Sequence, residues 1–255
     1  MSASKLLDQP QTAWCSTREL PFEDGEKVES AWHLFQMILL CEVIKALHLD
    51  WYVGANMFVY FDEDQVKTRN FKGPDYFVVR DVPDARRDRK CWEIWNEGNK
   101  RPNVVIELLS ESTESEDKNN KKLVYQDDLK VPEYFLFSPS GGLLGYRLVN
   151  GIYKAINADS RGRMVSEQLG LALRVWKGAY QDSDSLIWLR WETLSGQLLL
   201  TQEEMKEQAL QLAADERTQK EQALKDAERA LEAAERERQR ADKFAALLKE
   251  RGIEL

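Results

Sequence analysis

Two acidic residues in apolar surroundings are the side chains of this sequence best suited to chemistry. Asp75 directly precedes the apolar run 76–79, and Glu107 lies inside the apolar run 104–109. Strand side chains point alternately to opposite faces, so the neighbours that share a face with Glu107 are apolar. A carboxylate in such a place is costly to bury unless it is paired or binds a metal ion. Glu107 is therefore the residue that most needs an explanation.

Asp75 and Glu107 together could hold a divalent metal ion of the kind that assists cleavage of phosphodiester bonds. Mg²⁺ prefers oxygen ligands and is commonly held by one or two carboxylates, waters and substrate phosphates. Such an ion polarises the phosphate and lowers the pKa of an attacking water. Two alternatives stay open, because Asp75 also fits a turn at a strand start and Glu107 also fits a salt bridge at a strand edge.

Further polar side chains follow at helical spacing. Asp117, Lys121 and Tyr125 are four residues apart, so they would share one face of a helix. Lys121 near a metal-bound water would orient it or stabilise the charge of the transition state. The alternative is an exposed ion pair between Asp117 and Lys121. Glu29 and His33 are also four apart and would edge the same site or form a helix-surface pair, and we favour the surface pair for His33.

The elements that must position these residues can be read from periodicity and turn signals. A helix is expected over 28–47, with an apolar face formed by Trp32, Phe35, Ile38, Leu39 and Ile44. A capping box at Thr113–Glu116 predicts a second helix that runs to about Leu129. Strand-like segments lie at 57–60, 76–79, 104–109 and 134–137, with a hairpin of 143–148 and 151–156 around Asn150-Gly151 and short strands over 160–200.

Composition limits the class of protein. The net charge is −8 over 255 residues, and the first 200 residues alone carry about −5, which gives no general electrostatic footprint for nucleic acid. Three cysteines without paired spacing read as reduced thiols, and two histidines are too few for a histidine-rich zinc site. The first ten residues lack a signal-peptide pattern and no apolar run reaches a membrane span. We expect a cytoplasmic protein that does not enter a membrane.

The composition changes at about Leu200. From Thr201 to Arg251 there is no Pro or Gly, and nine of twelve heptad a and d positions are apolar. This pattern supports a coiled coil through which the chain self-associates. Five of the nine are alanine, so the seam would be weak, and a solvated single helix held by local charge pairs stays open as the alternative.

The order of these motifs resembles a known family. Pro74-Asp75 is followed by the run Pro102–Thr113 with Glu107 inside it, then by Asp117-x3-Lys121-x3-Tyr125 and by Val131-Pro132-Glu133-Tyr134-Phe135. Over about residues 20–200 the chain resembles the Uma2-type restriction endonuclease family, a branch of the PD-(D/E)XK nuclease superfamily. The Ala-, Glu- and Arg-rich tail is similar to the tails of many members.

The resemblance implies an α/β (α+β) fold, with a restriction-endonuclease-like core whose central mixed sheet is flanked by helices. The domain would span 1–200, with a helical or coiled-coil tail over 201–255. Asp75 and Glu107 fall on the two acidic positions of the superfamily. Its lysine normally lies two residues after the second acid, where this chain has Leu109, and Lys121 is the natural substitute.

Two functions follow as competing expectations. The first is an endonuclease that hydrolyses DNA with Mg²⁺ or Mn²⁺, using Asp75 and Glu107 as metal ligands and Lys121 as a catalytic residue. Glu29, which matches an acidic residue of the first core helix, and Tyr125 would support the site. The second is a catalytically inactive nuclease-like binding or assembly module, which Leu109 and the acidic body favour. An RNA-directed or repair nuclease would differ from the first only in its substrate.

Overall fold

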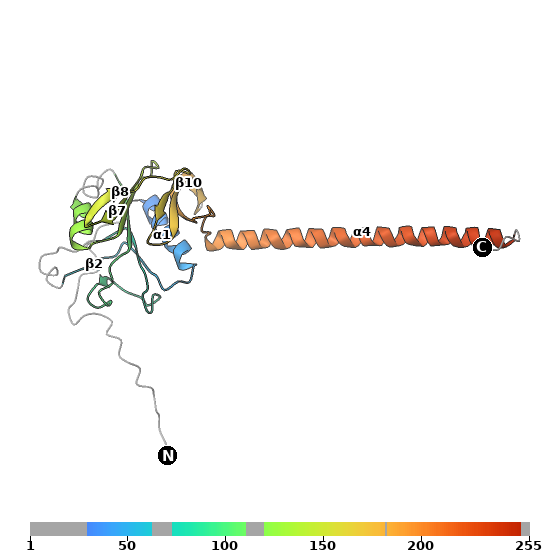
Figure 1. The fold of residues 1–255 in the computed structure, drawn as a ribbon, viewed down its shortest axis with the longest axis horizontal. Helices are drawn as coiled ribbons and strands as arrows, with labels where there is room; N and C mark the ends of the chain where they lie inside the picture. The colour runs from blue at the N-terminus through green and yellow to red at the C-terminus, as the bar shows by residue number, and fades with distance from the viewer. Residues whose placement is uncertain (1–29, 63–72, 111–119, 182, 251–255) are drawn as a thin grey trace, which may run out of the picture. The chain divides into compact units, whose positions relative to one another are not determined.

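The computed structural model describes residues 30–62, 73–110, 120–181 and 183–250, and it divides the chain into two compact units. The first unit is Met1–Thr201 and the second is Gln202–Leu255. The first holds a mixed sheet, the helix α1 and a second, smaller sheet (Figure 1). In the second, the structure describes the long helix α4, Gln202–Glu250.

The central sheet has six strands in the order β1-β3-β5-β6-β7-β8. The pair β5 and β6 is parallel and the other neighbours are antiparallel, so the sheet is mixed. A parallel pair needs a long crossover connection, and the chain between β5 and β6 supplies it. The strands are β1 Tyr52–Ala55, β3 Tyr76–Val79, β5 Val104–Leu108, β6 Glu133–Phe137, β7 Leu143–Val149 and β8 Ile152–Ala155.

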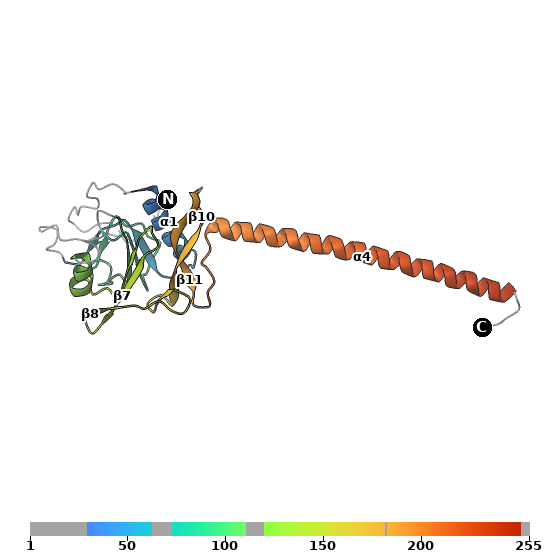
Figure 2. The ribbon, with the colours of Figure 1, turned by 90° about the horizontal axis from the view of Figure 1, so that it is seen from above.

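Helix α1, Ala31–Lys45, lies between the central sheet and the second sheet (Figures 1 and 2). Ser30 caps its start by accepting the N–H of His33 at 3.1 Å. The second sheet has the order β11-β10-β9, with β9 Met164–Ser166, β10 Leu171–Tyr180 and β11 Ser183–Thr193. The buried Gln36 side chain joins helix and sheet, donating to Leu189 O at 2.9 Å and accepting from Leu189 N at 2.8 Å.

The two faces of β5 meet different parts of the core. Val104, Ile106 and Leu108 pack into the cluster that contains α1 and the second sheet. Val105 and Leu109 pack into the cluster on the opposite face, which includes Tyr125 of the π-helical segment η2, Val124–Asp128. The alternation expected from the sequence is therefore confirmed, and it directs Glu107 toward η2. Two short strands, β2 Val59–Tyr60 and β4 Trp92–Glu93, pair in parallel next to this cluster.

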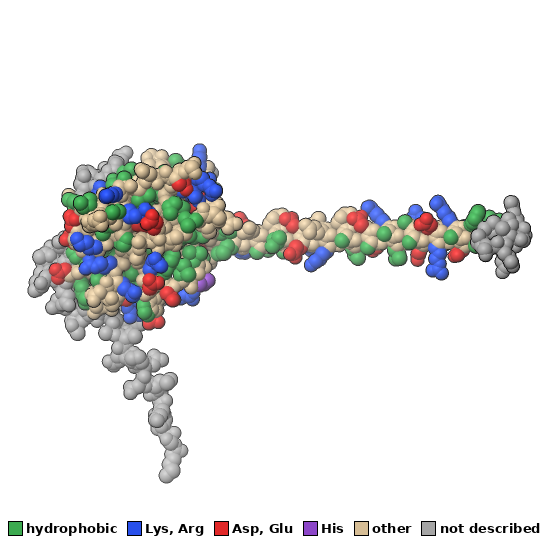
Figure 3. All heavy atoms as spheres, viewed as in Figure 1, with side chains coloured by type: hydrophobic (Ala, Val, Ile, Leu, Met, Phe, Trp, Pro, Cys, Tyr) green, Lys and Arg blue, Asp and Glu red, His purple; other side chains and the backbone are tan. Residues whose placement is uncertain are grey.

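Helix α4, Gln202–Glu250, is continuous over 49 residues. At 1.5 Å per residue its length is about 74 Å. Apolar, acidic and basic side chains are interspersed along its surface (Figure 3), and the exposed leucines are Leu210, Leu212, Leu224, Leu231 and Leu247. The long helix expected from the tail composition is present and fits a coiled coil. Among the helices that the structure describes, none has the length and apolarity needed to cross a membrane.

The expected fold class is confirmed, and so are most of the strands. The hairpin turn has Asn150 at φ 52° and Gly151 at φ 80°, as a tight β7–β8 turn requires. Two expectations were wrong. The strands expected to be short in 160–200 include a long hairpin of β10 and β11, and the apolar face assigned to the first helix includes Ile38, which is 41% exposed. The capping box at Thr113–Glu116 lies outside the described residues.

Candidate functional site

Glu107 is fully buried and both of its carboxylate oxygens accept hydrogen bonds. The Lys121 ammonium lies 3.1 Å from Oε2, and the Tyr125 hydroxyl donates to Oε1 at 2.6 Å. Both donors come from the helical segment after β5, where a spacing of four residues places them on one side. The cost of burying the carboxylate is therefore offset by an ion pair and a charge-assisted hydrogen bond.

Asp75 lies next to Glu107 across the pairing of β3 with β5. Tyr76 is opposite Ile106 in this antiparallel register, which brings Asp75 beside Glu107. The Asp75 N–H points to Glu107 Oε2 at 3.4 Å, and Asp75 Oδ2 accepts the N–H of Leu108 at 2.7 Å. The two carboxylates thus belong to one connected group, where β3 begins and β5 ends.

His33 completes the group from the first turn of α1. Its Nε2 lies 3.0 Å from Asp75 Oδ1, and the residue is only 8% exposed. Burial raises the pKa of the Asp75 carboxyl, but the hydrogen bond and charge of His33, the charge of Lys121 and the N–H of Leu108 outweigh it and lower that pKa. Asp75 is therefore held as a carboxylate at neutral pH.

The hydroxyl of Tyr125 remains a hydrogen-bond donor in this setting. Its complete burial, followed by the negative charge of Glu107, raises its pKa well above the usual value. Leu109, at the position where a lysine would be expected, is buried in the apolar cluster around Tyr125. The positive charge that lies beside Glu107 is that of Lys121.

The structure brings together Asp75, Glu107, Lys121 and Tyr125, and it adds His33. Glu29 and Asp117 lie outside the described residues. Within the described ranges, no three His, Cys, Asp or Glu side chains are grouped closely enough to form a metal site by themselves. Among the residues that the structure describes, the acidic side chains of the candidate site are Asp75 and Glu107.

A protein-family model described as "Uma2: Putative restriction endonuclease" matches residues 25–179, more than half of the chain. The chain belongs to this family. The matched region includes the elements that carry the candidate site, from α1 through η2, and it ends within β10, so α4 lies beyond it. Membership indicates a nuclease-like function. No curated protein matches the chain.

The surface location favoured for His33 from the sequence was wrong, because the residue is 8% exposed, and its expected partner Glu29 lies outside the described residues. His33 lies on the side of α1 that also carries the buried Gln36, Met37 and Leu40, at helical spacing from them. Because α1 is covered by two sheets, its apolar residues extend around the helix and no single stripe marks the core side. The spacing of 33, 36, 37 and 40 was the available signal that His33 faces inward.

Replacing Tyr125 with phenylalanine is expected to lower the free energy of unfolding by about 1.5–3 kcal/mol, because a buried carboxylate loses a charge-assisted hydrogen bond. Urea unfolding at neutral pH measures the loss. Tyr153→Phe is a matched control, since that buried hydroxyl donates to the neutral carbonyl of Val131 at 2.8 Å and should cost about 1 kcal/mol. Equal losses in the two variants would contradict a charged Glu107 partner.

Proposed function

We propose that the protein is a divalent-metal-dependent endonuclease that hydrolyses phosphodiester bonds of DNA. The observation that carries the proposal is the convergence of two carboxylates and a lysine: Asp75 and Glu107 are neighbours across two strands, and Lys121 lies 3.1 Å from Glu107 Oε2. Membership of a nuclease-like family supports the same assignment.

The donor set suits Mg²⁺ or Mn²⁺. Both acidic residues offer hard carboxylate oxygens, and one or two carboxylates with waters and substrate phosphate are enough for Mg²⁺. The Asp75 side chain is 17% exposed, so the group can be reached from solvent even though Glu107 is enclosed. Asp75 and Glu107 would hold the ion, which when bound supplies charge to the scissile phosphate and acidifies a water.

The other side chains have separate roles in this proposal. Lys121 places a positive charge beside both carboxylates and would stabilise the negative charge that develops on the phosphate. Tyr125 and His33 are positioning residues, because they act on Glu107 and Asp75 and fix the orientation of each carboxylate. Glu29 would support the same site from the chain preceding α1.

A second candidate function is a catalytically inactive module for binding or assembly. Two observations favour it. Leu109 replaces the lysine on the strand, and both oxygens of Glu107 are already bonded to Lys121 and Tyr125. In this case the buried charges would serve the fold, and α4 would provide the assembly element.

DNA is the proposed substrate, with RNA or damaged DNA as substrates of the same chemistry. The acidic charge of the chain opposes nucleic acid in general, so binding must use bound cations or a local basic surface. We also propose a cytoplasmic location and self-association through α4. The cysteines Cys41 and Cys91 are free, which agrees with a reducing compartment.

Metal binding can be tested through the two histidines of the chain, because His33 contacts Asp75 while His48 lies beyond the other end of α1. Titration with Mg²⁺ is expected to shift the ring resonances of His33 in a saturable way and to leave those of His48 unchanged. Mn²⁺ should broaden the His33 signals selectively. The Asp75→Asn variant should show neither response, and supercoiled plasmid should be nicked by the wild type alone. An unresponsive His33 in the wild type would favour the inactive module.

A further inference from the structure

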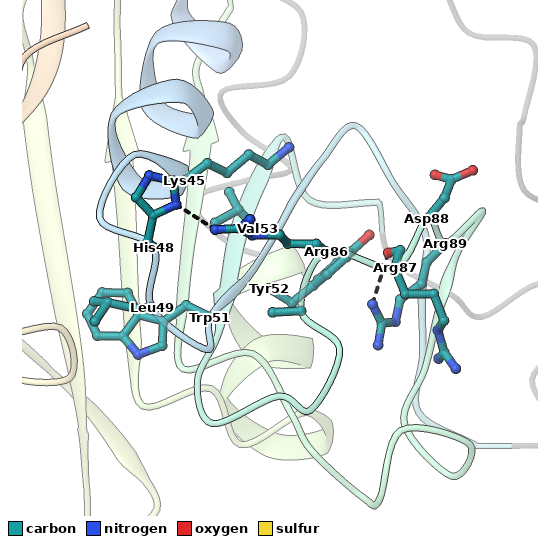
Figure 4. Close-up of a pocket in the computed structure, with 11 residues that line it drawn as sticks. Lys45, His48, Leu49, Trp51, Tyr52, Val53, Arg86, Arg87, Asp88 and Arg89 are labelled. Atoms are coloured by element: carbon teal, nitrogen blue, oxygen red, sulfur yellow. Dashed lines mark hydrogen bonds between the residues drawn. The ribbon is translucent and has the colours of Figure 1, made fainter. Parts of the chain in front are cut away.

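A basic pocket lies at the opposite end of α1 from the candidate site. It has a volume of about 320 Å³ and is lined by the end of α1, the start of β1 and the loop 85–89 (Figure 4). His33 and Lys45 are twelve residues apart on the helix, so the two locations are separated by about 18 Å along its axis. The pocket is therefore distinct from the group around Asp75 and Glu107.

The charge of the pocket is opposite to that of the chain. Lys45, Arg86, Arg87 and Arg89 line it, with Asp88 as the acidic residue among the lining side chains. Glu97 pairs with Arg87 and Arg89 and neutralises part of this charge. In the part of the chain that the structure describes, no carboxylate forms an ion pair with Lys45 or Arg86. A local excess of positive charge remains in a protein whose net charge is −8.

Two of the lining side chains, Arg86 and His48, reach toward one another. The Arg86 Nη2 atom lies 2.5 Å from His48 Nδ1, and Figure 4 shows the two side chains meeting at the pocket. Arg89 is fixed more firmly, with its guanidinium 4.7 Å from the centre of the Tyr52 ring and its side chain 5% exposed. A bound anion would be met by Lys45 and Arg86, because Arg89 already donates to Glu97 and to the carbonyls of Asp84 and Arg87.

We propose that this pocket binds a phosphate group, and that the phosphate belongs to the backbone of a DNA substrate. Arginine and lysine at a pocket edge are the side chains that recognise phosphate oxygens. A volume near the lower end of ligand-pocket sizes suits one phosphate with its sugar. The assignment of DNA as the source rests on the proposed nuclease function, whereas the phosphate site itself rests only on the pocket.

The phosphate site can be tested without DNA. Inorganic phosphate, added at constant pH and ionic strength, is expected to shift the ring resonances of His48 saturably and to leave those of His33 unchanged. The double variant Lys45→Gln with Arg86→Gln should lose the response, and both side chains are exposed, so the fold should be retained. The matched control is Lys154→Gln with Lys177→Gln, which removes two exposed lysines outside the pocket and should keep the response. If the His48 ring resonances of the wild type do not change when phosphate is added, the proposed phosphate site is wrong.

The source of the phosphate is decided by duplex DNA binding, measured by fluorescence anisotropy with divalent ions chelated. The pocket variant is expected to bind about tenfold more weakly. The slope of log affinity against log salt concentration should also be smaller in magnitude by about one to two, because two cations that can contact phosphates are removed. The control variant should match the wild type. If the wild type shows the His48 response to phosphate and the pocket variant binds DNA as tightly as the wild type, DNA is overturned as the source and a free phosphate ligand remains. Failure of the nuclease proposal would appear separately, as His33 ring resonances that do not change when Mg²⁺ or Mn²⁺ is added.

Discussion

Replacing Glu107 with glutamine is expected to reduce metal-dependent cleavage of duplex DNA by at least about a hundredfold while the protein stays folded. The change removes the negative charge at nearly constant volume. An amide oxygen can still accept the hydroxyl of Tyr125, but the ion pair with Lys121 is lost. Plasmid nicking and linearisation with Mg²⁺ or Mn²⁺ measure the effect, and thermal unfolding checks the fold.

Glu133 provides a matched control for this variant. It is also a fully buried glutamate of the central sheet, but it lies at the other end of the β5–β6 pair, opposite Val104. Its carboxylate accepts from Ser166 Oγ at 2.5 Å and pairs with Arg147 at 3.1 Å. Glu133→Gln should lower stability without affecting the cleavage rate per folded molecule.

The comparison of the two variants separates chemistry from folding. If both reduce cleavage in proportion to lost stability, Glu107 is a structural residue and the inactive module becomes the better function. If Glu107→Gln cleaves at the wild-type rate, the activity belongs to another site or to a contaminant. Loss of cleavage in Glu107→Gln alone supports the proposed role of this carboxylate.

The position of Glu107 could be predicted from the sequence because its signal is local. An apolar run with one internal acid defines both the strand and the face of the acid, and β5 has this alternation. The proximity of Glu107 to Asp75, by contrast, has no local signal. It depends on the register in which Phe77 is opposite Val105, and no local pattern of the sequence encodes that pairing.

The features that the sequence did not predict are those that depend on contacts between distant parts of the chain. Strand β1 is four residues long and contains Gly54, which weakens the strand pattern. The glycine is required because a Cβ there would overlap the ring of Phe77 on the neighbouring strand. In the same way, the spacing of 33, 36, 37 and 40 places His33 on a buried side of α1, but its partner Asp75 is distant in the sequence and helix periodicity alone does not identify it.

Removing residues 202–255 is expected to leave a folded body with a lower oligomeric state. Thr201 is 4% exposed and belongs to the first unit, so the cut is placed after it. Within α4, pairs such as Arg217 with Glu221 at 3.1 Å are exposed and contribute only a few tenths of a kcal/mol each. The larger gain available to the helix is burial of its apolar seam against a second copy. Light scattering over a range of concentrations measures the change.

Two pairs of leucine substitutions test the seam without removing the helix. Leu224 and Leu231 are at heptad a positions. In the same heptad register, Leu212 and Leu247 are at c positions, outside the seam. Their exposures in the single chain are similar, at 63% and 66% against 61% and 55%. Changing either pair to glutamate should therefore affect the isolated helix about equally, and only pairing of two helices distinguishes them.

Leu224→Glu with Leu231→Glu is expected to dissociate the oligomer, because it places like charges opposite one another in the seam. Leu212→Glu with Leu247→Glu should keep the oligomeric state of the wild type. The alanines at most d positions bury little area, so the wild-type association should be modest and should strengthen with protein concentration. Identical oligomeric states for the wild type, both variants and the truncated chain would show that α4 is not the assembly element.

Two cores joined through α4 would place two candidate sites in one particle, which is the arrangement that cutting both strands of a duplex requires.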